Sequence, residues 1–154
     1  MGIVTKIKKL SPNAKIPTYG DDGAIGADLY ASEEKTIKAG ERMLVGTGIA
    51  VSAEDTFATR VPGVVKELEG YFRVAPRSGL SVKGIDVGAG VVDLSYRGEI
   101  KVVLINNSKD DKKVEVGDRI AQLIFEYALK SEFVEVEELD STERGVGGFG
   151  STGK

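Results

Sequence analysis

Short runs of alternating apolar and polar residues, separated by turn residues, make up most of this chain. Alternation with a period of two is typical of strands with one buried face, and clusters of Gly, Pro, Asn and Asp end such runs. Gly46 and Gly48 interrupt one run and predict a bulge or a close approach of two backbone segments. The pattern predicts strands at residues 3–7, 27–31, 35–38, 42–52, 71–75, 99–106, 113–116, 120–127 and 133–136.

Two of these runs indicate how the core is built. In residues 99–106 the apolar residues Ile100, Val102 and Leu104 share one face. Residues 120–127 are mostly apolar, which predicts a strand buried on both faces. A helix is the alternative for residues 120–127, but the Gly-Asp turn before them and their β-branched content favour a strand. At most one short helix is expected, near residues 79–82. Many short strands at regular spacing predict an all-β fold, jelly-roll-like or a distorted β-barrel.

Composition restricts the possible catalytic chemistry more than it restricts the possible folds. The 154 residues suffice for one domain with a real core, and a net charge of −3 without a basic run argues against binding a nucleic acid polymer. The chain has no Cys and no His, so disulfides, thiol nucleophiles and cysteine-ligated zinc are excluded, and acid–base chemistry must use carboxylates, Lys or Tyr. No apolar run approaches the roughly 20 residues that span a bilayer. We expect an intracellular protein, in the cytoplasm or nucleus.

The last residues, RGVGGFGSTGK, differ from the rest in being rich in glycine. They match parts of a P-loop and of a dinucleotide-binding turn, but neither the strand–loop–helix nor the βαβ context of those motifs is present. A disordered tail is the simple alternative. Against it, Arg144 and Phe149 stand among glycines whose N–H groups can turn toward an anion, and Ser151 and Thr152 add donors. We therefore expect a β domain of residues 1–143 and a lid of residues 144–154.

Two further segments suit an anionic or flat ligand. Arg77 and Ser78 stand in Ala-Pro-Arg-Ser-Gly-Leu, where a short helix would add backbone N–H donors, although an ordinary turn explains the same residues. Residues 88–99 resemble a hairpin with small residues at its mouth. It contains Asp93 and Tyr96, for which a strand-capping Asp and a core Tyr are the structural alternatives.

Two polar residues interrupt apolar strands. Asp28 lies within Ile-Gly-Ala-Asp-Leu-Tyr-Ala, and an unpaired carboxylate there would be costly, so it needs a partner or a cation nearby. Gln122 lies within Asp-Arg-Ile-Ala-Gln-Leu-Ile, where a satisfied core amide is an equally good interpretation.

Five segments together resemble the trimeric deoxyuridine triphosphatases, the dUTPase family. They are IGADLYA (25–31), PRSGLS (76–81), GAGVVDLSYRGE (88–99), GDRIAQLI (117–124) and RGVGGFGSTG (144–153). Each alone is a weak signal, but five in order over nearly the whole chain are specific. The resemblance implies a jelly-roll-like subunit in a homotrimer with active sites between subunits. The first, second and fourth segments would come from one chain, the third from a neighbour and the tail from the third chain.

The reaction implied is hydrolysis of dUTP to dUMP and pyrophosphate with Mg²⁺ on the triphosphate, limiting uracil in DNA and supplying dUMP for dTMP synthesis. Asp93 would deprotonate the attacking water, a task that suits a carboxylate ionised at neutral pH. Tyr96 would lie against the deoxyribose and leave no room for a 2′-hydroxyl. The backbone of Gly90, Val91, Val92 and Asp93 would select uracil, since cytosine would leave buried groups unpaired. Thymine would be excluded by its methyl group.

The remaining positions would bind phosphate and metal. Asp28 would hold waters of the Mg²⁺ shell rather than the metal itself. Arg77, Ser78 and Gly79 would contact the phosphates, and Gln122 would fix the α-phosphate and the water. In the tail, Arg144 would meet the γ-phosphate, Phe149 would stack on uracil, and Gly150, Ser151 and Thr152 would bind phosphate, so that the tail closes over the site.

The chain departs from the family pattern in three places. Ile25 replaces the usual Ala and is expected to crowd its strand, residues 61–70 form a longer turn than usual, and residues 83–85 are one residue short of the pattern. Two other functions compete with dUTP hydrolysis: a related dCTP deaminase activity, which the Tyr96 segment and the tail disfavour, and a non-catalytic regulator that binds nucleotide and a protein partner.

Overall fold

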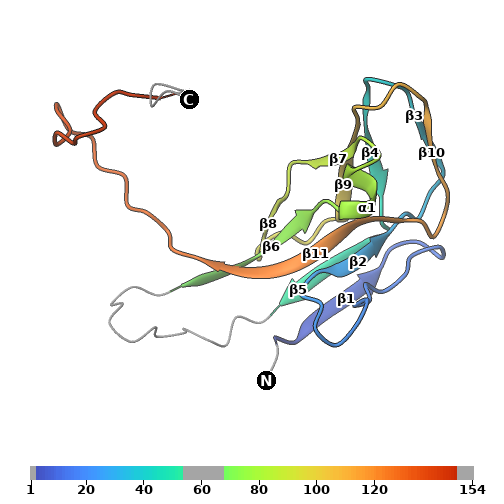
Figure 1. Cartoon of the computed structure of the whole chain (residues 1–154). Coiled ribbons are helices and arrows are strands. Elements are labelled where there is room, and N and C mark those ends of the chain that lie inside the picture. Colours follow the sequence, from blue (N-terminus) through green and yellow to red (C-terminus); the bar gives the residue numbers. More distant parts are fainter. Residues whose placement is uncertain (1–2, 54–67, 149–154) are drawn as a thin grey trace.

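The computed structural model describes residues 3–53 and 68–148 (Figure 1). In these residues it forms β1 (Thr5–Lys9), β2 (Ala27–Tyr30), β3 (Lys35–Ile37), β4 (Arg42–Gly46), β5 (Ile49–Ala53), β6 (Glu69–Ala75), α1 (Ser78–Ser81), β7 (Ile85–Gly88), β8 (Val91–Asp93), β9 (Lys101–Asn106), β10 (Lys112–Val114) and β11 (Arg119–Ala128). The prediction of an all-β fold with at most one short helix is confirmed for this part of the chain.

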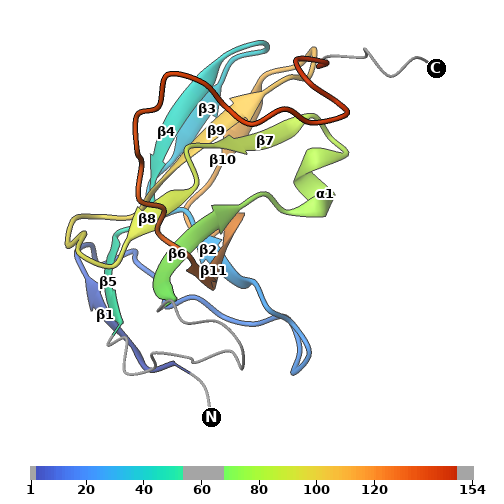
Figure 2. The ribbon, with the colours of Figure 1, turned by 90° about the vertical axis from the view of Figure 1, so that its left-hand side faces the viewer.

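The strands of the described residues form four small antiparallel sheets. Their orders are β2-β11-β6-β8, β4-β9-β7, β1-β5 and β10-β3. Figure 2 shows β4, β9 and β7 side by side above β6 and β11. Strands adjacent in sequence often lie in different sheets, as in a jelly-roll-like fold, and sheets that face one another can bury a common core.

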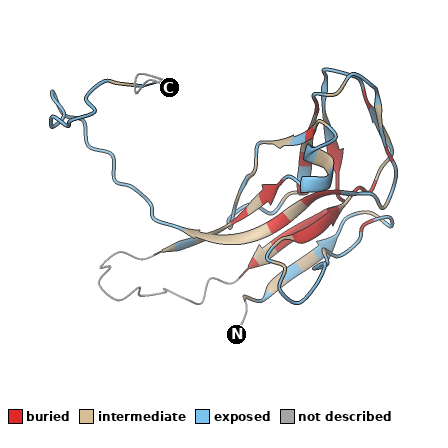
Figure 3. Ribbon diagram, in the orientation of Figure 1, coloured by how far each residue is buried: buried red, intermediate tan, exposed pale blue. Residues whose placement is uncertain are grey.

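The core lies on the inward faces of these sheets (Figure 3). In β9 and the residue before it, Ile100, Val102 and Leu104 are at most 2% exposed, while the residues between them are more accessible, so the predicted alternation is confirmed. In β11 only the first half is deeply buried: Ile120 and Ala121 are covered on both faces, and the second half is half-buried. The prediction of burial on both faces therefore holds only for the first half of β11, which pairs with β2.

The long run predicted at residues 42–52 divides at its glycines into β4 and β5, which belong to different sheets. Gly48 has φ of +69° and would bring a Cβ to 3.0 Å from that of Ala14, so a side chain is excluded there by both conformation and space. The close backbone approach predicted from the glycines is confirmed by the Leu10 N–H, which donates to the Gly48 carbonyl at 2.7 Å.

The predicted strand at residues 133–136 is wrong. In the described part of the chain these residues form no strand, and Phe133 is 94% exposed. After β11 the chain leaves the β sheets as an extended arm (Figure 1). Alternating Val and Glu residues suit a strand, but a strand needs a partner edge, and the described residues of the same chain provide none here.

The predicted hairpin at residues 88–99 is also wrong. Residues 94–99 form no strand, so the segment does not pair with itself; β7, which ends at Gly88, pairs with β9, and β8 pairs with β6. Between them Ala89 adopts φ of +53°, and Gly90 passes so close to the Val74 carbonyl that a Cβ would lie 2.6 Å from it. The close approach of Gly90 to β6 directs β8 onto that strand rather than back onto β7.

Two departures from the family pattern have little structural effect, and the third cannot be followed. Ile25 precedes β2 and is 74% exposed, so it does not crowd the strand. The short connection at 83–85 closes through Gly84, at φ of +80°, which leads directly into β7. Of the long turn, residues 61–67 lie outside the described residues.

Candidate functional site

The Asp28 cluster consists of Asp28, Arg77, Arg119 and Gln122, and lies where β2, β11 and β6 of the largest sheet are in register. Asp28 of β2 pairs in register with Gln122 of β11, which pairs on its other side with Ala75 of β6. Partners in antiparallel strands point to the same face, here the face opposite the core. Arg77 follows Ala75 by two residues, so the strand register brings three sequence-predicted residues, Asp28, Arg77 and Gln122, to one place.

The buried carboxylate is neutralised by two arginines. Asp28 is 5% exposed; Arg77 Nε lies 2.8 Å from its Oδ1, and Arg119 donates to its Oδ2 at 3.3 Å. The predicted need for a partner is confirmed, since a buried carboxylate without one would be costly. One carboxylate against two guanidinium groups leaves the cluster with excess positive charge, which favours an anionic ligand. Arg119, which stands in the fourth segment and provides the second cation, was not predicted from the sequence.

The side chain of Gln122 lies against Gly26. A Cβ at Gly26 would lie 2.8 Å from Gln122 Oε1, so only glycine leaves room for this amide. Within the described residues the Gln122 amide makes no hydrogen bond, and the residue is half-buried. Its donor and acceptor are therefore available to a ligand.

Helix α1 places Ser78 and Gly79 at the surface, directly after Arg77. Both residues are exposed, and no side chain caps the first turn of the helix. Their backbone N–H groups and the Ser78 hydroxyl are thus accessible beside the Asp28 cluster.

Asp93 lies at the end of β8, an edge strand. Its backbone pairs with Tyr71 of β6, and Val91 pairs with Arg73, so Val91 and Asp93 point to the same outer face as Asp28 while Val92 contacts the core. Asp93 is exposed, and its side chain forms no hydrogen bond with a described residue. It is therefore no capping residue held by the fold.

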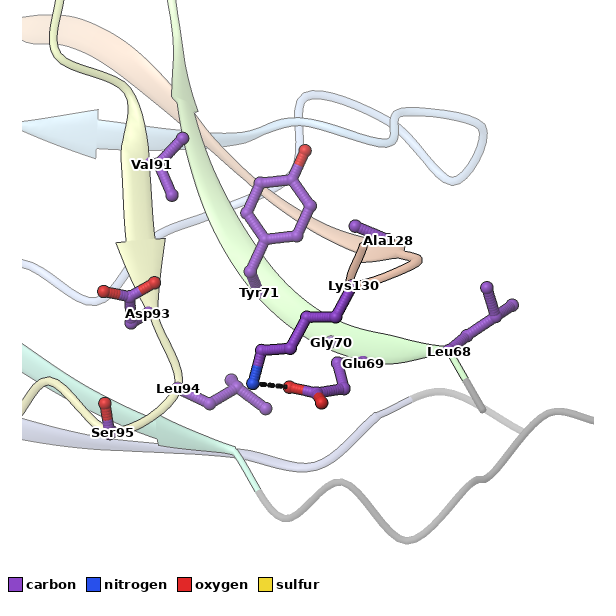
Figure 4. Close-up of a pocket in the computed structure, with 10 residues that line it drawn as sticks. All are labelled: Leu68, Glu69, Gly70, Tyr71, Val91, Asp93, Leu94, Ser95, Ala128 and Lys130. Atoms are coloured by element: carbon purple, nitrogen blue, oxygen red, sulfur yellow. Dashed lines mark ion pairs between the residues drawn. The ribbon is translucent and has the colours of Figure 1, made fainter. Parts of the chain in front are cut away.

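Two hollows flank β8, and Asp93 lines both. The larger, with a volume of about 840 Å³, runs along the ends of β6 and β11 and contains the Lys130–Glu69 ion pair (Figure 4). The smaller has a volume of about 330 Å³, within the range of small-molecule sites. Its lining residues are Leu44, Ala89, Val91, Val92, Asp93, Tyr96, Glu99, Ile100 and Lys101.

Tyr96 is not a core tyrosine. It is 48% exposed, its N–H donates to the Asp93 carbonyl at 3.0 Å, and its hydroxyl donates to the Glu99 carbonyl at 3.1 Å. The ring therefore stands at the wall of the smaller hollow, beside Asp93.

A polar network lies beside Asp93 on the same outer face of the sheet, in strands β6 and β11. The Tyr71 hydroxyl donates to Glu126 at 2.5 Å, and the Arg73 guanidinium donates to both oxygens of the same carboxylate. The hydrogen bonds from Arg73, and then that from Tyr71, lower the pKa of Glu126 to about 2. This network was not predicted from the sequence; its only signals were Tyr71 and Arg73, two positions apart in one predicted strand, and Glu126 in another strand that is mostly apolar.

The Asp28 cluster and Asp93 do not meet within one chain. Through Gln122, Asp28 is in register with Ala75 of β6, whereas Asp93 is in register with Tyr71 of the same strand. Four residues along a strand span about 13 Å, and the two strand spacings from β11 to β8 add about 10 Å at right angles. Asp93 is therefore about 16 Å from Gln122 along the sheet, too far for one phosphate to contact both.

The tail residues lie apart from both groups. Arg144 is exposed on the arm and donates to the carbonyl of Gly147 at 2.9 Å. The other predicted tail residues, Phe149, Gly150, Ser151 and Thr152, lie outside the described residues.

The Asp28 cluster suits a hydrated metal better than direct coordination. Among the described residues no group of three or more acidic side chains is close enough to hold a metal ion. Each oxygen of Asp28 already accepts from an arginine, so direct ligation would disrupt an ion pair. Magnesium usually keeps several waters and binds one or two carboxylates and substrate phosphates, a role that Asp28 can fill by accepting from bound water. No described helix is long and apolar enough to cross a membrane.

Comparisons with known proteins agree on one family. A family model described as dUTPase matches residues 12–153. The chain is 49% identical to deoxyuridine 5'-triphosphate nucleotidohydrolase of Candida albicans, over 97% of this chain and 87% of that protein. It is 50% identical to the cowpox virus protein of the same name, over 94% and 90%. The structure resembles the G164S mutant of a Staphylococcus bacteriophage 80alpha dUTPase with dUpNHpp: TM-score 0.79, 24% identity, coverage 98% and 99%.

Proposed function

The chain belongs to the dUTPase family, and on that premise we propose that it hydrolyses dUTP to dUMP and pyrophosphate at sites built between subunits of a homotrimer. The separation of Asp93 from the Asp28 cluster is the observation that supports this most strongly. Both groups lie on the same outer sheet face, yet a single α-phosphate cannot contact both in one chain. A site that uses both must take them from two chains.

The smaller hollow accepts the deoxyuridine moiety. Val91, Val92 and Asp93 line it and, with the adjacent Gly90, offer main-chain groups to uracil. The Tyr96 ring stands beside Asp93 where the sugar would lie. Main-chain donors and acceptors held by β-sheet pairing cannot adapt to cytosine, so the wrong base leaves them unpaired.

Asp93 acts as the general base. It accepts a proton from water as the water oxygen forms a bond to the α-phosphorus. The bond from the α-phosphorus to the bridging oxygen breaks, and pyrophosphate leaves with that electron pair. Exposure of the carboxylate, without a hydrogen bond to a described residue, leaves both its oxygens available for the water.

The Asp28 cluster of a second chain binds the triphosphate. Arg77, Ser78 and Gly79 donate to phosphate oxygens, and the Gln122 amide orients the α-phosphate and the water. Mg²⁺ bound through waters on Asp28 would supply neutralisation of the triphosphate charge.

Residues 144–154 act as the lid over this site. The arm that starts after Ala128 is extended, and the roughly 16 residues to Arg144 can reach up to about 50 Å, enough to cross to another subunit. Arg144 would then meet the γ-phosphate, Phe149 would stack on uracil, and Gly150, Ser151 and Thr152 would donate to phosphate. The β domain, residues 1–143, provides the remaining contacts.

Pyrophosphate release from dUTP, dCTP, dTTP and UTP, with and without Mg²⁺, tests the proposal. We expect rapid release from dUTP with Mg²⁺, and kcat/KM lower by at least about 100-fold for each of the other nucleotides. Equal turnover of dCTP and dUTP, or release of ammonia from dCTP, would contradict it.

A further inference from the structure

We propose that Gly98, together with the Glu99 carbonyl, holds the Tyr96 ring in the position that excludes ribonucleotides. The inference rests on the proposed function and names residues that set its sugar specificity. Gly98 is a positioning residue, since it would act only through the ring of Tyr96.

The ring is fixed by local contacts rather than by the core. Tyr96 is 48% exposed, so packing does not immobilise it. Its hydroxyl donates to the carbonyl of Glu99, three residues along, and the ring folds back over Gly98. A Cβ at Gly98 would lie 2.5 Å from Cζ and 2.9 Å from Cε2 of the ring, closer than real Cβ contacts allow.

The backbone at Gly98 does not itself require glycine. Gly98 is not among the described glycines with positive φ, so alanine fits its backbone conformation. What excludes alanine is the Tyr96 ring alone. A substitution at this position therefore moves the ring and leaves the backbone conformation allowed.

The rest of the turn is fixed independently of Gly98. The Tyr96 N–H donates to Asp93, and the Arg97 guanidinium donates to the carbonyls of Leu94 and Tyr96. The ring is thus the movable part of a closed turn that begins at the catalytic carboxylate.

Sugar selection depends on how firmly this wall is held. A pocket rejects a substrate with one extra hydroxyl only if its wall cannot move aside. The Tyr96 ring and Asp93 line the same 330 Å³ hollow, so a ring displaced by a methyl group would open space beside the sugar while Asp93 keeps its place.

The test measures kcat/KM for dUTP and for UTP in wild type, Gly98→Ala and Tyr96→Phe. For Gly98→Ala we expect the dUTP/UTP ratio to fall by about tenfold or more, with kcat for dUTP reduced less than kcat/KM. Tyr96→Phe keeps the ring but loses the bond to Glu99, and its ratio should fall about threefold. Gly20→Ala, at an exposed glycine with nothing within 4 Å, is the matched control and should equal wild type.

Each result decides between the two proposals. If wild type hydrolyses dUTP and both variants keep its dUTP/UTP ratio, the inference fails and the proposed function survives. An equal loss for both nucleotides would assign Gly98 a merely structural role. If Gly98→Ala does not fold, as thermal melting would show, an unchanged ratio in Tyr96→Phe overturns the inference. Wild type without dUTP hydrolysis would instead overturn the proposed function.

Discussion

The Asp28 cluster and the Asp93 strand share one face of one sheet, but they are built in opposite ways. Asp28 is almost fully buried, paired with two arginines, and held between β11 and the segment that contains Thr18. Asp93 is exposed, without a side-chain hydrogen bond to a described residue, on an edge strand of three residues. The first group is complete in one chain, whereas the second lies between two open hollows.

We therefore expect mutations in the two groups to differ in their effects on stability and on activity. Changes in the Asp28 cluster should affect both folding and activity, because a buried charge loses its partner. Changes at Asp93 should affect activity alone, because nothing in the described fold depends on that carboxylate.

The largest expected effect on activity is at Asp93. Replacing it with Asn removes the base while keeping size, so kcat should fall at least about 1,000-fold with little change in dUTP binding or melting temperature. Steady-state kinetics and calorimetric titration with a non-hydrolysable dUTP analogue measure the two effects. Unchanged hydrolysis would remove Asp93 from its assigned role.

Arg77→Ala should disturb both properties. It leaves the buried Asp28 carboxylate with only the longer Arg119 contact, and the free energy of unfolding should fall by about 2–3 kcal/mol. Activity should fall about 100-fold through lost phosphate contacts.

Two variants control the Arg77 measurement. Arg144→Ala removes the same side chain from the exposed arm and should leave chemical denaturation unchanged. Adding Asp28→Asn to Arg77→Ala should recover part of the lost stability, since no buried charge remains. If the double variant is no more stable than Arg77→Ala, the ion pair is not what stabilises the cluster.

Removal of residues 144–154 tests the lid without touching either group. The truncated chain should fold and melt as wild type does, while kcat/KM for dUTP falls by about 100-fold because closure and phosphate contacts are lost. Full activity after truncation would reject the lid.

The smallest expected effect is on stability, at Glu126 in the polar network beside Asp93. Its pKa is lowered from 4.5 to about 2 by Arg73 and Tyr71, so its contribution to stability is present above pH 4.5 and is lost as pH falls toward 2. Glu126→Gln should melt slightly below wild type at pH 6, and the difference should vanish near pH 2. A difference that is constant with pH would show that ionisation of Glu126 does not contribute.

Most of the fold could be predicted because strand alternation and turn residues are local signals. The two wrong predictions depend on distant partners: residues 133–136 have strand-like sequence without an edge to pair with, and residues 88–99 divide because Gly90 meets Val74. For the site, the cost of burying Asp28 predicted a partner or a cation nearby, and Arg77 was already a candidate phosphate-binding residue. Arg119 and the Tyr71–Arg73–Glu126 network were missed, since only register across β11 brings these residues together.

The most direct test of sites shared between chains is to mix two inactive variants. Asp93→Asn and Arg77→Ala chains, each shown to fold, are unfolded together in equal amounts, refolded and assayed for pyrophosphate release from dUTP. If Asp93 and Arg77 of one site come from different chains, about one quarter of the sites in random trimers have both intact, and activity returns to about a quarter of wild type. Activity no higher than that of the two variants refolded separately would contradict the account.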